Sequence, residues 1–465
     1  MLKKISLLFS LALLTVICAF SANAGFLAYE EQPYSEMEEI KIIDHVVYKF
    51  SENSKGEKYY QVFDWFDTKE ASEAVKEINI VPEIDGIKVT QIGKHMNESE
   101  GGKYSRNKNY SVKKITIPDT VVRIEDYFFS VLDGVEELTI PASIKSFYPN
   151  GIYDDGLRIT FVGMENLKKV TVLGDLESLG GFKDCKKLET VVLKGSVNEI
   201  TSGSFENCTA LKNIQIPKSV KKIGDRAFAN TSITSVTLPA NVMLGHYNGY
   251  VFENCKKLTN VVFVGDKNDW IEIYNGSFKN CTALKSVTFP KNIKGMTVYE
   301  SAFINCKALQ SVKFPATCGK LTIGDDAFRN CTSLKTVTLP KTTTGVTIGY
   351  RAFRNCQKLS KVYYATNIEK IYGGAFRGCV SLTSLTLNKI KMIGKNAFYG
   401  CKKLKTITVN GKSSAPKIYK NAFYNTAKGI KFTAKNEAAA KKWKTALSSS
   451  GLKNMKVVYL KYISV

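Results

Sequence analysis

The hydrophobic positions of this chain follow one pattern that returns many times. The typical copy reads Phe-x-x-Cys-x-x-Leu-x-x-Val-x-Leu-Pro, and an Ile-Gly pair and an Ala-Phe pair then lead into the next copy. The part Leu-x-x-Val-x-Leu, as in Leu284–Phe289, alternates apolar and polar residues and predicts a short β-strand. The proline then ends the strand, because it has no N–H to give to a ladder. The glycine after Ile permits a tight bend.

Phenylalanines mark the copies, most of them 21 to 26 residues apart. They are Phe129, Phe161, Phe182, Phe205, Phe228, Phe252, Phe278, Phe303, Phe328, Phe353, Phe376, Phe398 and Phe423. The longer gap from Phe129 to Phe161 holds an insertion around Phe147–Asp155. No copy contains a helix-length amphipathic run, so each coil has to bury its apolar side chains against the coils beside it. We therefore predict a mostly β solenoid of about 13 coils, with parallel ladders of strands about 4.8 Å apart.

The two ends of the chain depart from the repeat. Residues 25–80 contain two strand-like segments, Val46–Phe50 and Tyr59–Trp65, which flank a polar turn and predict an acidic β-hairpin cap. The repeat region is assigned to residues 81–430. Residues 431–465 are predicted to form a C-terminal cap, in which a helix from Asn436 is followed by a strand up to Tyr462. Capping is expected because the open strand edges of a solenoid invite aggregation.

The first 24 residues have the form of a secretory signal peptide. Lys3 and Lys4 precede the apolar stretch Ile5–Phe20, and Ala22-Asn-Ala24 supplies the small residues before a cleavage site. The apolar stretch is short and wrongly flanked for a membrane span. Export would leave Gly25 as the first residue of a chain without a membrane span, in a secreted or cell-surface protein.

The repeat resembles a known family. The motif Asn-Cys-x-x-Leu-x-x-Val-x-Leu-Pro followed by Ile-Gly-x-x-Ala-Phe is similar to the BspA-type (Treponema-type) leucine-rich repeat of secreted and cell-surface proteins, over roughly residues 81 to 430. The resemblance implies a leucine-rich-repeat solenoid with parallel sheets. It also implies a place outside the cell and adhesion to host matrix proteins or other cells. The coils at Phe161, Phe228 and Phe423 depart from the motif, because they lack the cysteine.

Nine of the eleven cysteines fall at one position of the repeat. They are Cys185, Cys208, Cys255, Cys281, Cys306, Cys331, Cys356, Cys379 and Cys401. Export would suggest disulfides. However, the side chains of one ladder point the same way, which suits poorly the dihedral angle that a disulfide needs, and nine cysteines cannot all form pairs. We therefore expect buried free thiols. Without a Cys-x-x-Cys or Cys/His cluster, no zinc site and no cofactor is expected.

The formal net charge of +24 is unevenly distributed. Residues 25–100 hold 17 acidic against 8 basic side chains, whereas residues 101–465 carry a net charge of +31. Lysines of the repeat fall into three sets of equivalent positions and are the candidate ligand-binding residues. They are Lys187, Lys257, Lys358 and Lys403 after the cysteine, Lys212, Lys285, Lys335 and Lys405 beside the strand, and Lys218, Lys291 and Lys341 after the proline. Adjacent lysines in such rows would repel one another unless acids or a polyanion intervene. The alternative is a solvated surface.

These observations favour a binding protein over an enzyme. The chain contains no Gly-x-Ser-x-Gly, no His-Glu-x-x-His and no phosphate-binding glycine loop, and His45, His95 and His246 are isolated. No catalytic or metal-binding residue and no small-molecule substrate is therefore expected. The partner expected first is a host matrix or cell-surface protein. Two alternatives stay open, a polyanionic glycan bound by the lysines and a structural or antigenic spacer without a partner.

Overall fold

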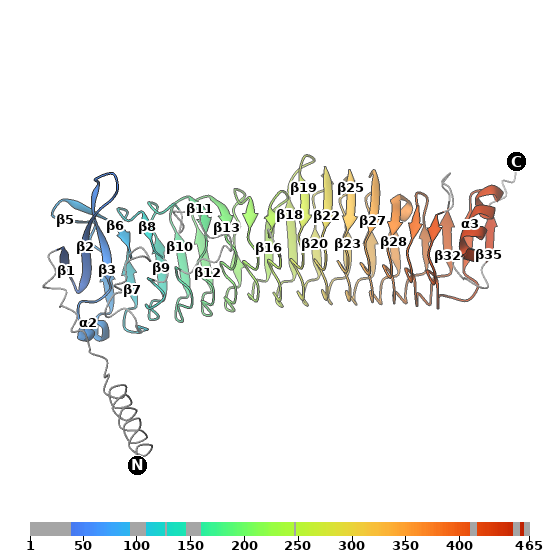
Figure 1. The fold of residues 1–465 in the computed structure, drawn as a ribbon. Helices are drawn as coiled ribbons and strands as arrows, with labels where there is room; N and C mark the ends of the chain where they lie inside the picture. Colours follow the sequence, from blue (N-terminus) through green and yellow to red (C-terminus); the bar gives the residue numbers. More distant parts are fainter. Residues whose placement is uncertain are drawn as a thin grey trace, which may run out of the picture.

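The protein is described by a computed structural model over most of its length. The described residues are 39–93, 108–125, 128–145, 160–245, 248–409, 416–449 and 456–459. The expected signal peptide at residues 1–24, the insertion at 147–155, His95 and His246 lie outside these ranges. The chain forms an elongated β-solenoid of about 14 turns, close to the 13 coils expected, with strands stacked side by side along its length (Figure 1).

Two ladders of parallel strands run along the solenoid. The first ladder is formed by the strand that follows the repeated cysteine or its equivalent position in each coil, and the two ends of the chain extend it. Its strands are β4 (Glu77–Asn79), β7 (Lys114–Thr116), β9 (Glu137–Ile140), β10 (Lys169–Val172), β12 (Thr190–Leu193), β14 (Asn213–Ile214), β16 (Ser235–Pro239), β18 (Asn260–Val264), β20 (Ser286–Thr288), β23 (Ser311–Lys313), β26 (Thr336–Thr338), β28 (Lys361–Tyr363), β30 (Ser384–Thr386), β32 (Thr406–Val409), β34 (Lys431–Ala434) and β35 (Lys456–Tyr459). They form four separate sheets, from β4 to β14, β16 to β20, β23 to β28 and β30 to β35.

The second ladder follows after a short turn in each coil. Its strands are β8 (Arg123–Ile124), β11 (Leu176–Leu179), β13 (Val197–Ile200), β15 (Lys222–Ile223), β17 (Met243–Leu244), β19 (Trp270–Ile273), β22 (Gly295–Val298), β25 (Lys320–Ile323), β27 (Gly345–Ile348), β29 (Ile368–Ile371), β31 (Met392–Ile393) and β33 (Lys417–Ile418). A small extra pair, β21 (Asn292–Ile293) and β24 (Thr317–Cys318), lies between the ladders. A glycine follows many strands of the second ladder, as Gly224 follows β15, and it lets the backbones of neighbouring coils approach closely. A Cβ on Gly224 would lie 2.3 Å from the backbone N of Ser202.

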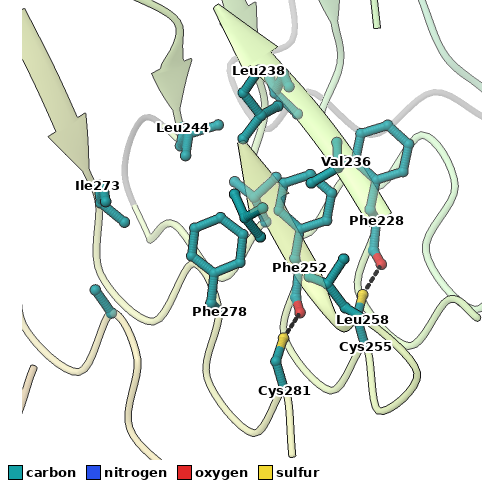
Figure 2. Close-up of a cluster of buried hydrophobic side chains, with 14 of the residues drawn as sticks. Phe228, Val236, Leu238, Leu244, Phe252, Cys255, Leu258, Ile273, Phe278 and Cys281 are labelled. Carbon is teal, nitrogen blue, oxygen red and sulfur yellow. Dashed lines mark hydrogen bonds between the residues drawn. The ribbon is translucent and has the colours of Figure 1, made fainter. Parts of the chain in front are cut away.

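The repeated phenylalanines form a continuous stack inside the solenoid. From Phe161 to Phe423, neighbouring rings lie 4.8–5.6 Å apart between centroids, with interplanar angles of 10° or less. Figure 2 shows Phe228, Phe252 and Phe278 of this stack, with leucine, valine and isoleucine side chains of the two ladders around them. All thirteen rings are buried, so the stack and the ladders make one core.

The cysteines fill the interior beside this stack. All ten described cysteines are free and buried, as expected for nine of them. Each thiol at the repeated position donates to the backbone oxygen of the phenylalanine one coil earlier, with Sγ···O distances of 3.0–3.2 Å. Figure 2 shows two of these bonds, from Cys255 to Phe228 and from Cys281 to Phe252. Burial raises the pKa of Cys255 to about 12, so this thiol is neutral.

The N-terminal end is an antiparallel sheet stacked on the first coil. Strands β1 (Ile40–Ile43), β2 (Val46–Glu52) and β3 (Lys58–Asp64) are antiparallel neighbours, and β2 and β3 form the hairpin expected from the sequence. Strand β3 pairs in parallel with β6 (Ile87–Ile92), which also pairs with β5 (Glu83–Ile84) and β8. The sequence did not predict the six-residue helix α2 (Lys69–Ala74), which begins after the Thr68 cap.

The C-terminal end carries helix α3 (Glu437–Ser449), close to the helix expected from Asn436. Strand β34 lies beneath it, and the ring of Phe432 lies 6.0 Å from that of Trp443. The last strand, β35, falls within the strand expected before Tyr462, and it pairs in parallel with β34, so it continues the first ladder. In Figure 1 the helix and β35 lie at the far end of the solenoid from the hairpin.

Candidate binding surface

The eleven candidate lysines are all exposed. They lie at the turns before and after the strands of the first ladder, as the repeat predicts. Nζ of Lys187 donates to Asn166, Nζ of Lys212 lies 3.7 Å from a carboxylate oxygen of Glu189, and Nζ of Lys341 lies 5.3 Å from the ring centre of Tyr364. The other eight form no ion pair with a described carboxylate. The sequence therefore placed these residues on the surface correctly.

The lysines do not stack on one another in adjacent coils. Equivalent positions in successive coils form what we call a column. In the column beside the strand, Lys285, Gln310 and Lys335 alternate, and Ala316 lies between Lys291 and Lys341 in the column after the proline. Two lysines of one column are therefore at least two coils apart. This is a distance of about 10 Å, which equals about one Debye length at 0.1 M salt. The repulsion expected from rows of adjacent lysines is therefore largely absent.

The outer face of the first ladder carries mainly hydroxyl side chains, with one aromatic interruption. Residues at its centre pair in register, as Thr386 does with Thr408 and Thr408 with Thr433. In β28 this position holds Tyr363, opposite Thr338. Tyr363 and the following Tyr364 are 44% and 42% exposed. We call these two residues the tyrosine pair.

Tyr364 occupies a position that is elsewhere part of the core. Its equivalent one coil earlier is Leu339, which is buried. In Tyr364 the backbone has φ of 57°, a left-handed conformation, which turns the side chain outward. The following turn, Ala365–Asn367, is held in place because Nδ2 of Asn367 donates to the backbone oxygens of Pro340 and Lys341. Such a conformation at a bulky residue costs energy and is often associated with function.

A second surface follows the turns at the phenylalanine stack. We call it the turn edge, and define it by the residues two before and one after each core phenylalanine. In its first half, Arg226 forms ion pairs of 2.7 Å with both Glu206 and Glu253. Lys183 and Lys279 extend this chain at 3.2 and 3.0 Å from the same two carboxylates. Charges of opposite sign alternate here, so this half is internally neutralised.

An asparagine ladder runs along the turns and was not predicted. Its members precede the repeated cysteine position and have left-handed backbones, with φ near 60°. They are Asn207, Asn230, Asn254, Asn280, Asn305, Asn330 and Asn355. From Asn230 onward, each Nδ2 donates to the asparagine Oδ1 one coil earlier at 2.7–3.1 Å. Asn207 begins the ladder, and its Nδ2 donates to a carboxylate oxygen of Asp184 at 2.7 Å. The repeated Asn-Cys dipeptide was the signal for it.

No metal site and no membrane-crossing helix is found in the part of the chain that the structure describes. Within that part, no three His, Cys, Asp or Glu side chains are grouped to hold a metal ion. No helix there has both the length and the apolar character needed to cross a bilayer.

Comparison with known proteins identifies the repeat. The family model described as BspA type Leucine rich repeat region (6 copies) matches residues 102–158, 158–259, 245–345 and 296–431, which is more than half of the chain. The chain belongs to the BspA-type leucine-rich-repeat family. This confirms the resemblance drawn from the sequence motif. No curated protein matches the chain.

Several solved structures are similar to this BspA-type protein. One is a leucine-rich repeat protein from Bacteroides ovatus, with 21% identity over 76% of this chain and 94% of the other, at a TM-score of 0.38. Another is a leucine rich cell surface protein from Faecalibacterium prausnitzii, with 19% identity, coverage of 91% and 96%, and a TM-score of 0.37. The pneumococcal vaccine antigen PcpA has 19% identity, coverage of 91% and 98%, and a TM-score of 0.35. The family assignment rests on the repeat itself.

Proposed function

We propose that the protein is exported and acts without catalysis, by binding a host matrix or cell-surface protein through the tyrosine pair on its first ladder. The observation that carries this proposal is Tyr364, a large aromatic side chain turned outward at a position where the neighbouring coil has a buried leucine. Tyrosine is enriched at the centre of protein interfaces, because it offers much contact area at a low cost in conformational entropy.

The surroundings of the tyrosine pair fit a protein partner. Tyr363 stands in a row of short hydroxyl side chains, so an approaching surface meets the aromatic rings first. Lys341 lies over the ring of Tyr364, and Lys361 begins the same strand as Tyr363. Exposed lysines at the rim of an aromatic patch favour fast encounter with an acidic surface more than they add affinity.

Export is supported by the N-terminal sequence. Lys3 and Lys4, the apolar stretch Ile5–Phe20 and the Ala22-Asn-Ala24 site have the order of a signal peptide. The ten buried free thiols are compatible with an oxidising compartment, because a thiol hidden in the core does not meet an oxidant. We therefore place the protein outside the cytoplasm, secreted or at the cell surface.

The binding test uses the purified protein without residues 1–24 on immobilised fibronectin, fibrinogen and heparin, over a salt series. We expect saturable, salt-tolerant binding to one of the two proteins. The double variant Tyr363→Ala/Tyr364→Ala should weaken it by about 30-fold or more, since truncation of a central tyrosine costs about 2 kcal/mol or more. The control is Tyr424→Ala, which removes a 57% exposed tyrosine on the turn edge.

Two results would contradict the proposal. Heparin binding that collapses with salt and is lost on removal of lysines, but not of the tyrosine pair, would establish the glycan alternative. Its salt dependence would follow from the release of counterions. No binding to any of the three surfaces would favour the spacer alternative.

A further inference from the structure

The second half of the turn edge has a different charge pattern from the first. Four of the eight arginines of the chain lie between residues 329 and 377. Arg329, Arg354 and Arg377 each follow a core phenylalanine, so they occupy the same column in three successive coils. In the first half this column holds Lys183, Glu206, Ala229, Glu253 and Lys279, so its cations have carboxylates beside them. In the second half, three cations follow one another in the column without a carboxylate between them.

One carboxylate, that of Asp326, compensates part of this charge. Oδ2 of Asp326 lies 2.7 Å from a guanidinium nitrogen of Arg351, and Oδ1 lies 3.6 Å from one of Arg329. Asp326 is buried, and its Oδ1 accepts no hydrogen bond. This carboxylate thus engages two of the four arginines.

Arg354 and Arg377 have no anionic partner among the described residues. Nε of Arg354 is buried without a hydrogen-bond partner, and so is Nε of Arg329. The guanidinium of Arg377 lies 4.7 Å from the ring centre of Tyr399. Burial, together with the charges of the three neighbouring arginines, lowers the pKa of Arg354. Like charges held this close repel one another, and an anion between them would remove that repulsion.

Three of the four arginines, Arg351, Arg354 and Arg377, line an open pocket of about 450 Å³. Tyr350, Lys395 and Asn396 also line it, as does Asp325, whose Oδ1 accepts a hydrogen bond from the backbone N–H of Tyr350 at 2.7 Å. Gly373 and Gly374 form its floor, at positions where the two neighbouring coils carry Tyr350-Arg351 and Lys395-Asn396. A Cβ on Gly374 would lie 3.5 Å from Cγ of Arg351 and 3.9 Å from Cβ of Arg377, so the missing side chains leave the space between these two arginines.

We propose that this arginine pocket binds an oxyanion group, as a phosphate or sulfate monoester carried by a ligand. The planar guanidinium offers paired donors that match the oxygens of such a group, which explains arginine here in a chain that otherwise uses lysine. Lys395 adds a fourth cation to the pocket, and Tyr350, half exposed at the pocket, can contact the part of the ligand that carries the anion. The pocket goes beyond the proposed adhesion, because it lies on the turn edge and not at the tyrosine pair.

Calorimetric titration of the purified protein tests the proposal. The probes are inorganic phosphate, inorganic sulfate, glucose 6-phosphate and glucosamine 6-sulfate, at constant ionic strength. We expect saturable binding of at least one ester. Tighter binding of the phosphate or of the sulfate ester identifies which of the two is the natural source of the oxyanion. The variants Arg354→Gln and Arg377→Gln should each weaken binding by tenfold or more, because a charge-assisted hydrogen bond is lost.

The control is Lys307→Gln, which removes the same charge from an exposed site outside the pocket. It should change the affinity by less than twofold. Loss of folding does not confuse the result, because Arg354→Gln removes an unpaired cation and should unfold at the same or a higher temperature without anion. The proposal is overturned if none of the probes binds saturably, or if Arg354→Gln and Lys307→Gln weaken binding equally.

Discussion

The asparagine ladder allows a sharp prediction for Asn280. Its Nδ2 donates to Asn254 at 2.9 Å, its Oδ1 accepts from Asn305 at 2.8 Å, and its φ is 61°. Asn280→Ala removes two hydrogen bonds, each with a net contribution of about 1 kcal/mol. Alanine in a left-handed conformation costs about another 1 kcal/mol. We therefore expect the central coils to lose about 2–4 kcal/mol.

Two comparison variants separate the two contributions. Asn280→Gly loses the hydrogen bonds but not the backbone conformation, which glycine adopts freely, so it should cost about 1 kcal/mol less than Asn280→Ala. Asn425 lies in the same column, with φ of 57°, but the ladder has already ended and its side chain forms no hydrogen bond with a described residue. Asn425→Ala should therefore cost only about 1 kcal/mol.

The assay is native-state hydrogen exchange of the backbone amides around Asn280, with urea unfolding as a second measurement. Exchange is preferred because a long repeat array need not unfold in a single step. The reasoning is refuted if Asn280→Ala is no more destabilising than Asn425→Ala.

Three further predictions concern the core and the turn edge. Phe278→Ala leaves a cavity in the ring stack and should cost about 3–5 kcal/mol, measured by urea unfolding. The Cys255 thiol, with its pKa raised to about 12, should resist iodoacetamide until the protein unfolds. The thiol of the unfolded chain ionises near pH 8.5, so the neutral buried thiol contributes fully to the free energy of unfolding below that pH, and this contribution is lost as the pH rises toward 12. Between pH 7 and 10.5, the urea midpoint of Cys255→Ala should therefore fall less than that of the unchanged protein. Arg226→Met leaves two mostly buried carboxylates short of a partner and should cost about 1–3 kcal/mol, whereas Lys358→Gln should leave the urea midpoint unchanged.

The apolar positions were predictable because their physics repeats with the chain. A phenylalanine every 21 to 26 residues can be buried only against its equivalents, and the strand, the proline and the glycine bend follow from local rules. The free thiols followed from the same logic, since residues of one ladder point the same way. Helix α2 could not be predicted, because six residues are too few to show a helical period.

The polar features depend on conformation and were harder to predict. The repeated asparagine was visible in the sequence, but its ladder requires a left-handed backbone that places successive amides one above the other. The arginine pocket had a signal that was missed, the concentration of half of the arginines in residues 329–377. The lysines attracted attention because they are numerous, yet the equivalent position in the coil between two candidate lysines holds a neutral residue, as Gln310 does between Lys285 and Lys335.

In a solenoid, the neighbours in a column supply the comparison that shows which residues are unusual. Every position has equivalents in the same environment, so a residue required only for folding resembles those equivalents, as Phe278 resembles Phe252. Tyr364 differs from a buried leucine one coil earlier, and its left-handed backbone is a cost that the core does not require. Arg354 differs in the same way, because Lys183 and Lys279 of its column pair with carboxylates, whereas Arg354 has no anionic partner among the described residues. A departure that costs stability is retained where it serves another purpose, and binding is the purpose that exposed rings and unpaired guanidinium groups can serve.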